Sequence, residues 1–169
     1  GDSWLSEPVE TFADYAKPRI SAQQKASLKR INIVFDSYYR EQSLYETGKV
    51  WEALETLQQN GYVYEDDGAQ WFRTTLFGDD KDRVLVKQSG EPTYRMPDIA
   101  YHWDKAQRGF DLGIDIFGPD HHATAPQVLM GVQALGYSTD FVHTVLHQIV
   151  YLLRGGEQVK MSTRRGDCV

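Results

Sequence analysis

The spacing of apolar residues predicts two helices in the first part of the chain. Residues 46–60 carry large apolar side chains at helical spacing, and the stripe consists of Val50, Trp51, Leu54 and Leu57. Gly61 follows directly and is expected to end this helix. Upstream, residues 22–37 predict a mainly helical segment with an apolar end, INIVF.

An alternating pattern follows and predicts a β-hairpin. The stretch GYVYEDDGAQWFRTT (61–75) alternates around an Asp-Asp-Gly turn. A charged loop, FGDDKDR, and a short strand, VLVK, come next. Residues 46–90 are therefore expected to form a small α+β insertion.

The segment TYRM (93–96) is expected to be extended, because Met96 precedes Pro97 and the residue before a proline avoids the helical region. Residues 98–108 then predict a helix, which Gly109 should end.

Three further apolar segments set the predicted fold class. LGIDIFG (112–118) predicts a strand and residues 127–135 predict a helix. Residues 141–153 fit either a helix or a buried strand, and their β-branched content favours at least part strand. The succession of helix, strand, helix and strand predicts an α/β fold with parallel strands joined by crossover helices.

Composition favours a folded protein of one domain or slightly more, since 41% of the 169 residues are hydrophobic and 12% aromatic. The net charge of −6 gives no overall attraction to nucleic acid, so such a contact would need a local patch. A single cysteine, Cys168, excludes an internal disulfide framework. No apolar run is long enough to span a membrane, and GDSWLSEPVE lacks the features of a signal peptide. We therefore expect a cytoplasmic location and no membrane partner.

Basic residues are concentrated near the N-terminus. Residues 17–30 carry five basic residues and no acid, whereas residues 1–15 carry four acids and no base. The basic segment is either a solvated helix face, the commoner situation, or a local binding face.

Tyr94 and Asp98 are the first candidates for ligand binding. Both should face the crevice at the carboxyl end of a strand, where open α/β sheets bind ligands. A phenol and a carboxylate there suit a cationic ligand, and a carboxylate can hold a guanidinium through two hydrogen bonds. The alternative is that Asp98 only caps a helix and Tyr94 only packs in the core.

The segment GPDHH (118–122) follows the predicted strand 112–118. Gly118 allows a ligand to approach the backbone closely, while Asp120 and His121 offer hydrogen-bonding groups. A metal site is the alternative, and its ligands would come from Asp120, His121, His122, His143 and His147. Adjacent histidines rarely bind one ion, and His143 and His147 have apolar neighbours that favour a structural role.

A basic, hydroxyl-bearing segment, VKMSTRRGD (159–167), follows a glycine pair. A lysine beside hydroxyl groups in such a loop is suited to neutralising the charge of a polyphosphate in a transition state. Many basic loops are simply solvated, so this segment alone is weak evidence.

Three motifs occur in a fixed order along the chain: TYRMPDIAYH, GPDHH and GEQVKMSTR. Together they resemble the second half of the class I catalytic domain of arginyl-tRNA synthetases. The similarity extends to FDSYYREQSLY (35–45) and to the insertion at 61–90, and covers residues 3–167. The resemblance implies a Rossmann-like fold with three parts. They are a helical connecting segment (1–45), an α+β insertion with the hairpin (46–90), and the second half of the nucleotide-binding domain (91–169).

The resemblance also implies roles for individual residues. Tyr94, Asp98 and His121 match positions that hold the substrate arginine, with the Asp98 carboxylate on the guanidinium. Gly118 and Asp120 match the strand end that frames the arginine and ATP pocket. In this family a KMSKS-type loop closes over the ATP phosphates. Its first residues are matched by Lys160, Met161 and Ser162, and the resemblance implies that Lys160 and Ser162 are catalytic.

The implied reaction has two steps. Arginine attacks the α-phosphate of ATP, which carries Mg²⁺, and arginyl-adenylate and pyrophosphate form. The arginyl group then passes to the 3′ end of its tRNA, without a covalent enzyme intermediate.

The chain departs from the family pattern in two ways. Thr163 stands where the loop's second lysine is expected, and it is followed by Arg164 and Arg165. A HIGH-type motif is not found in these residues and is expected before residue 1, with an anticodon-binding domain expected after the loop. We therefore expect a piece of a longer enzyme that is inactive alone. The whole enzyme is expected to be a monomer, and the piece could self-associate through an unpaired sheet edge.

Two other classes of function stay open at this stage. One is a non-catalytic paralogue that binds arginine or tRNA. The other is a metal-dependent phosphoesterase built on Asp120, His121 and His122.

Overall fold

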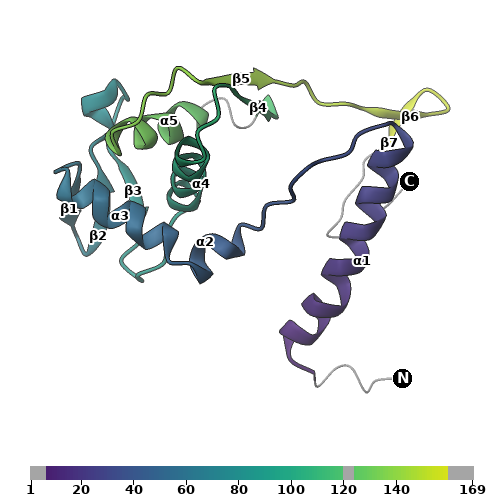
Figure 1. Cartoon of the computed structure of the whole chain (residues 1–169), viewed down its shortest axis with the longest axis horizontal. Helices are drawn as coiled ribbons and strands as arrows, with labels where there is room; N and C mark the ends of the chain where they lie inside the picture. The colour runs from purple at the N-terminus through teal and green to yellow at the C-terminus, as the bar shows by residue number, and fades with distance from the viewer. Residues whose placement is uncertain (1–6, 120–123, 160–169) are drawn as a thin grey trace. The chain divides into compact units, whose positions relative to one another are not determined.

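A computed structural model describes residues 7–119 and 124–159. The chain divides into two units, residues 1–39 and 40–169. Figure 1 gives the elements of both along the chain. No helix within the described residues is both long and apolar enough to cross a membrane.

The first unit contains a single helix, α1 (Val9–Arg30), which has no buried residue. It begins well before the predicted helix at 22–37, and Pro18 lies within it. The apolar INIVF segment lies outside the helix, so its predicted place at the helix end is wrong. Asn32 has a φ of 59°, in the left-handed region, and the chain leaves the helical conformation there.

The second unit begins with two helices and a three-stranded sheet. The helices are α2 (Gln42–Glu46) and α3 (Lys49–Gln59). The antiparallel strands are β1 (Val63–Asp66), β2 (Ala69–Phe72) and β3 (Arg83–Val86), with a 3₁₀ turn, η2 (Thr74–Phe77), before β3. Asp67 and Gly68 both have positive φ, as a type I′ turn requires, so the predicted hairpin is confirmed.

The helix α3 confirms the predicted helix at 46–60 but corrects its buried face. Val50, Leu54 and Leu57 are buried as expected, whereas Trp51 is 44% exposed. Ala53 is fully buried instead. The helix turns 100° per residue, so the position directly after Val50 points away from the core.

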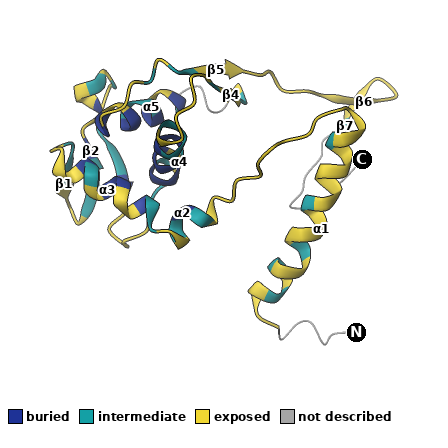
Figure 2. Ribbon diagram, viewed as in Figure 1, coloured by how far each residue is buried: buried dark blue, intermediate teal, exposed yellow. Residues whose placement is uncertain are grey.

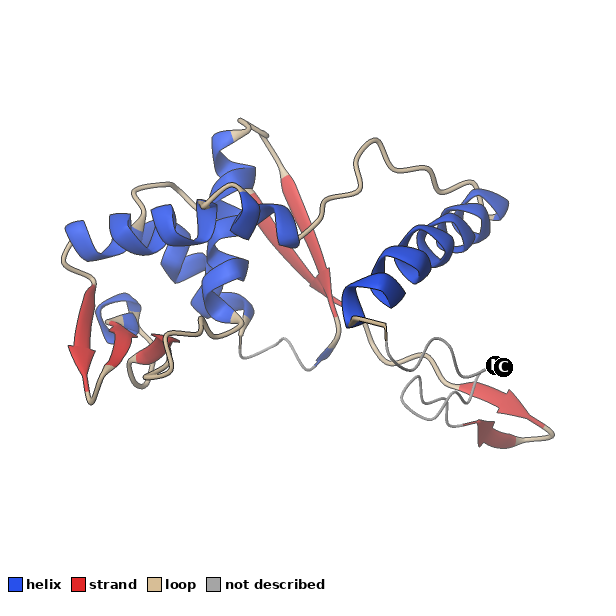
Figure 3. Cartoon of the chain, turned by 90° about the horizontal axis from the view of Figure 1, so that it is seen from below, coloured by secondary structure: helices blue, strands red, loops and turns tan. Residues whose placement is uncertain are grey.

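The remaining elements form a parallel α/β unit. They are α4 (Arg95–Gln107), β4 (Gly113–Phe117), α5 (Ala125–Ala134) and β5 (Val142–Leu146). The strands β4 and β5 pair in parallel and lie side by side in Figure 3. The predicted α/β class is confirmed, and residues 141–153 contain the strand that their composition favours. A hairpin of β6 (Leu152–Arg154) and β7 (Glu157–Val159) follows.

One apolar core serves α2, α3, the three-stranded sheet, α4 and α5. Buried residues are concentrated on these elements in Figure 2, where they are dark blue. Met96 and Ile99 of α4 are fully buried in it, and Gly131 of α5 lies directly against Ile99. The core therefore fixes the position of α4, which carries the candidate ligand-binding residues.

Candidate active site

The segment TYRM is not extended, contrary to prediction. Tyr94 occupies the N-cap position of α4, and Arg95 and Met96 are already helical. The backbone N–H of Met96 donates to the Thr93 carbonyl at 3.1 Å, and its side chain is fully buried. Core packing of Met96 thus outweighs the local preference that Pro97 imposes.

Because α4 begins at Arg95, Tyr94 and Asp98 lie one helical turn apart at its N-terminal end. Both side chains are exposed, and Tyr94 is 90% exposed. The predicted core role for Tyr94 is therefore excluded. A carboxylate in the first turn is also favoured by the positive end of the helix dipole.

Asp98 lines a cavity of about 280 Å³ formed by α4, β4 and the start of α5. Phe117 at the end of β4 and Thr124 just before α5 line it as well. Gly118 follows Phe117 directly, so Asp98 and the carboxyl end of β4 lie at one cavity. Tyr94 is not among the lining residues.

Beneath Asp98, three side chains form a buried polar network. The Nε2 atom of His102 lies 2.7 Å from Oδ2 of Asp115, and Nδ1 of the same ring lies 2.8 Å from the Asp98 backbone carbonyl. The Lys105 ammonium donates to Oδ1 of Asp115 at 2.6 Å. His102 and Asp115 are both buried. The network therefore connects the first turn of α4 with the middle of β4.

The ionised form of Asp115 is stabilised by this network. Burial alone raises the pKa of the carboxyl, but the hydrogen bonds from His102 and Lys105 outweigh burial and lower the pKa to about 2. Asp115 is thus a carboxylate at neutral pH, with each of its oxygens bound to a partner.

Sequence reasoning did not select this network, although two signals were present. His102 and Lys105 follow Asp98 at helical spacings of four and seven residues. Asp115 is the polar residue in the otherwise apolar strand LGIDIFG, and a buried polar side chain needs partners.

Several predicted site residues lie outside the described residues. These are Asp120, His121, His122, Lys160, Met161 and Ser162. Among the described residues, no group of three or more His, Cys, Asp or Glu side chains could hold a metal ion. His143 lies on the strand β5, and His147 follows one residue after this strand ends.

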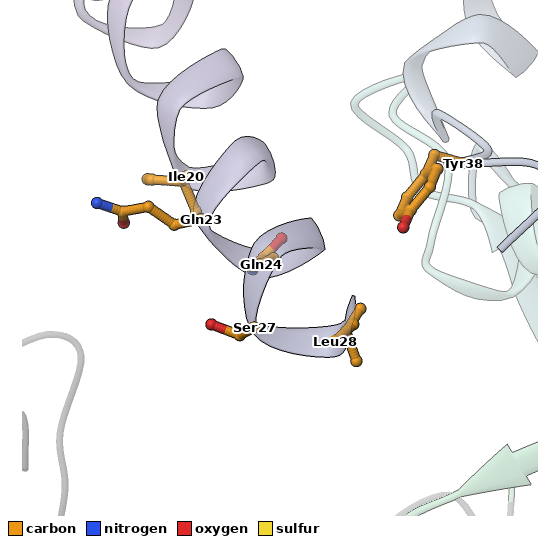
Figure 4. A pocket seen from close by; sticks show the side chains of 6 residues that line it. All are labelled: Ile20, Gln23, Gln24, Ser27, Leu28 and Tyr38. Carbon is orange, nitrogen blue, oxygen red and sulfur yellow. The ribbon is translucent and has the colours of Figure 1, made fainter. Parts of the chain in front are cut away.

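A second hollow, of about 430 Å³, lies within the first unit along α1 (Figure 4). Its lining contains amide, hydroxyl and apolar side chains, but no acid, base or histidine. It offers no candidate catalytic group.

Comparison with known proteins defines the class to which this fold and site belong. A family model described as tRNA synthetases class I (R), catalytic domain, matches residues 7–169. The chain therefore belongs to this family of class I tRNA synthetase (R) catalytic domains.

Individual relatives agree with this family. The chain is 52% identical over 170 residues to an arginine–tRNA ligase of Desulfotalea psychrophila, covering 100% of this chain and 31% of the relative. It is 51% identical to that of Salinibacter ruber, covering 97% of this chain and 29% of the relative. The chain thus spans about a third of the length of these relatives.

Solved structures share the fold. An arginyl-tRNA synthetase crystal structure from Campylobacter jejuni matches 89% of this chain and 33% of its own, with a TM-score of 0.80 and 36% identity. The Plasmodium falciparum arginyl-tRNA synthetase matches 85% of this chain and 26% of its own, with a TM-score of 0.66. At 14% identity, the second match concerns the fold alone.

Proposed function

We propose that this chain supplies the arginine-binding part of the active site of an arginine–tRNA ligase and acts within a longer polypeptide. The observation that carries the proposal is the exposed Asp98 carboxylate at the end of α4, on a cavity that it shares with the carboxyl end of β4. The family match and the names of the relatives support it.

The Asp98 carboxylate binds the guanidinium of arginine. Two oxygens can accept two parallel N–H bonds from this planar cation, which gives both affinity and orientation. Tyr94, one turn before, contributes a phenol to the same helix end. His121 completes the arginine site, and Gly118 and Asp120 frame the pocket between arginine and ATP.

The reaction then follows in two steps. The arginine carboxylate attacks the α-phosphorus of ATP, and pyrophosphate leaves. A 3′-terminal ribose hydroxyl of the tRNA attacks the carbonyl carbon of the adenylate, and AMP leaves. Lys160 and Ser162 stabilise charge on the transferring phosphates, with Met161 in the same loop. Mg²⁺ takes part as the counter-ion of the ATP phosphates and so belongs to that substrate.

The partners are arginine, ATP and the tRNA for arginine, in the cytoplasm, and the whole enzyme acts as a monomer. Self-association is proposed for the isolated chain only. Two strands of parallel sheet leave apolar side chains exposed, and Ile114 is 59% and Ile116 68% exposed.

Pyrophosphate exchange into ATP tests the proposal. The longer enzyme that contains this chain should catalyse exchange that depends on arginine and on none of citrulline, lysine or ornithine. The purified 169-residue chain should catalyse none, with or without tRNA. Exchange that another amino acid supports better than arginine would overturn the assignment, and exchange by the isolated chain would overturn the need for a longer polypeptide.

A further inference from the structure

A histidine ring joins the proposed arginine-binding helix end to the strand beneath it. His102 is 94% buried, since its exposed fraction is 6%. Its two ring nitrogens contact different elements: Nδ1 lies 2.8 Å from the Asp98 carbonyl of α4, and Nε2 lies 2.7 Å from the Asp115 carboxylate of β4. A planar ring held at both nitrogens has little freedom to rotate.

Asp115 is in turn held by Lys105, whose ammonium lies 2.6 Å from the second carboxylate oxygen. The side chain of Lys105 is 18% exposed and that of Asp115 is 9% exposed. Both side chains also line the cavity next to Asp98, and the pair is largely but not fully removed from solvent. Its charges are matched within hydrogen-bond distance, as a buried ion pair requires.

We propose that His102 is a positioning residue for arginine, and that Asp115 and Lys105 fix its ring so that it sets the position of Asp98. This inference rests on the proposed function, because it assigns a role to the residues that support the proposed guanidinium ligand. The three residues line the same cavity as Asp98 and act on it through the His102 ring.

Two features of the geometry explain why the position of Asp98 needs such support. Asp98 lies in the first turn of α4, where the first backbone N–H groups of a helix have no helical partner, so the bond between His102 and the Asp98 carbonyl adds to the core contacts that hold this turn. A carboxylate that binds a guanidinium through both oxygens must also be correctly oriented, since a small displacement removes one of the two bonds.

The network also separates the roles of the two carboxylates at this cavity. Both oxygens of Asp115 are bound by His102 and Lys105, while Asp98 is exposed at the cavity. Asp115 therefore stays in its internal pairing.

The test uses the longer enzyme and compares the KM for arginine with the KM for ATP. His102→Gln places an amide near the former Nε2 position, so it can still bond to Asp115 but loses the bond to the Asp98 carbonyl. We expect the arginine KM to rise about ten-fold, with the ATP KM within about two-fold of wild type. The melting temperature is measured in parallel, because a merely structural role would lower it without separating the two KM values.

The conservative variant Asp115→Asn should preserve the position of the His102 ring. In Asp115→Asn, the amide N–H can donate to a neutral His102 ring whose Nδ1–H still bonds to the Asp98 carbonyl, and the amide oxygen can accept from Lys105. This variant should keep an arginine KM within about two-fold of wild type, whereas Asp115→Leu should raise it about ten-fold. His143→Leu, at an exposed histidine of β5, is the matched control and should change neither KM.

The outcomes distinguish the inference from the proposed function. If Asp98→Ala raises the arginine KM but His102→Gln does not, the positioning role is wrong and the proposed arginine site stands. If His102→Gln raises both KM values equally, the positioning role is also wrong. If Asp98→Ala leaves the arginine KM unchanged, the proposed site itself fails, and the inference falls with it.

Discussion

Gly131 of α5 lies directly against the Ile99 side chain of α4. A Cβ atom at this position would lie 2.6 Å from Cδ1, 2.6 Å from Cγ1 and 2.8 Å from Cγ2 of Ile99. Ile99 is fully buried, and it sits one residue after Asp98 on α4. Gly131→Ala must therefore push α4 and α5 apart or force Ile99 from its rotamer.

Two opposing terms give the expected magnitude. Alanine in place of glycine within a helix contributes about 1 kcal/mol of stability. Overpacking of a filled core costs about 1 to 3 kcal/mol, and three contacts below 3.0 Å place this site at the upper end. Gly131→Ala should therefore reduce the free energy of unfolding by about 2 kcal/mol.

Urea unfolding followed by tryptophan fluorescence, to which the buried Trp103 contributes, measures this change. Gln133→Ala, at an exposed position of the same helix, is the control and should change stability little. Ile99→Ala removes all three contacting atoms, so in that background Gly131→Ala should become stabilising by about 1 kcal/mol. The same destabilisation in both backgrounds would refute the steric explanation.

Three further predictions follow from the site and the sheet. Because the pKa of Asp115 is lowered to about 2 from 3.8, its ionisation stabilises the fold. This contribution, on the order of 2 kcal/mol, is fully present above about pH 5 and is lost as the pH falls toward 2. The free energy of unfolding of Asp115→Asn, measured with urea, should lack this pH dependence. An equal change of the unfolding free energy with pH in both proteins would contradict the prediction. Ile116→Lys should reduce self-association of the isolated chain in analytical ultracentrifugation, and unchanged association would exclude the β4 face. Elemental analysis of the purified chain should find no stoichiometric zinc or manganese, and a full equivalent would favour the phosphoesterase alternative.

Elements with a strong local signal were predicted well. The turn at Asp67 and Gly68 requires positive φ at two successive residues, and few sequences other than Asp-Gly or Asn-Gly permit this. The strand 112–118 and the helix 127–135 were also predicted to within a few residues, because their apolar patterns are bounded by glycine or proline.

Prediction was wrong where distant packing decides local structure. Met96 is helical because it is buried in a core made by residues far away in sequence, and Pro97 alone gives the opposite expectation. The His102–Asp115 contact was missed for a related reason. It joins a helix to the following strand, and only their packing brings the two side chains together.

The candidate site could be predicted in part. The α/β pattern places both Tyr94 and Asp98 at a strand-end crevice, whereas only Asp98 lines the cavity next to β4. That Tyr94 and Asp98 share one helix end could not be predicted, since it depends on the helix beginning at Arg95. Asp120, His121 and the loop at 160–162 remain predictions.

The proposed function depends above all on the Asp98 carboxylate as the ligand of the arginine guanidinium. The most direct measurement is the arginine KM and the ATP KM of Asp98→Ala in pyrophosphate exchange by the longer enzyme. Leaving a bound guanidinium without its carboxylate costs on the order of 3 kcal/mol, so the arginine KM should rise by roughly 100-fold while the ATP KM changes little. An equal rise in both KM values, or no rise in the arginine KM, would contradict the claim.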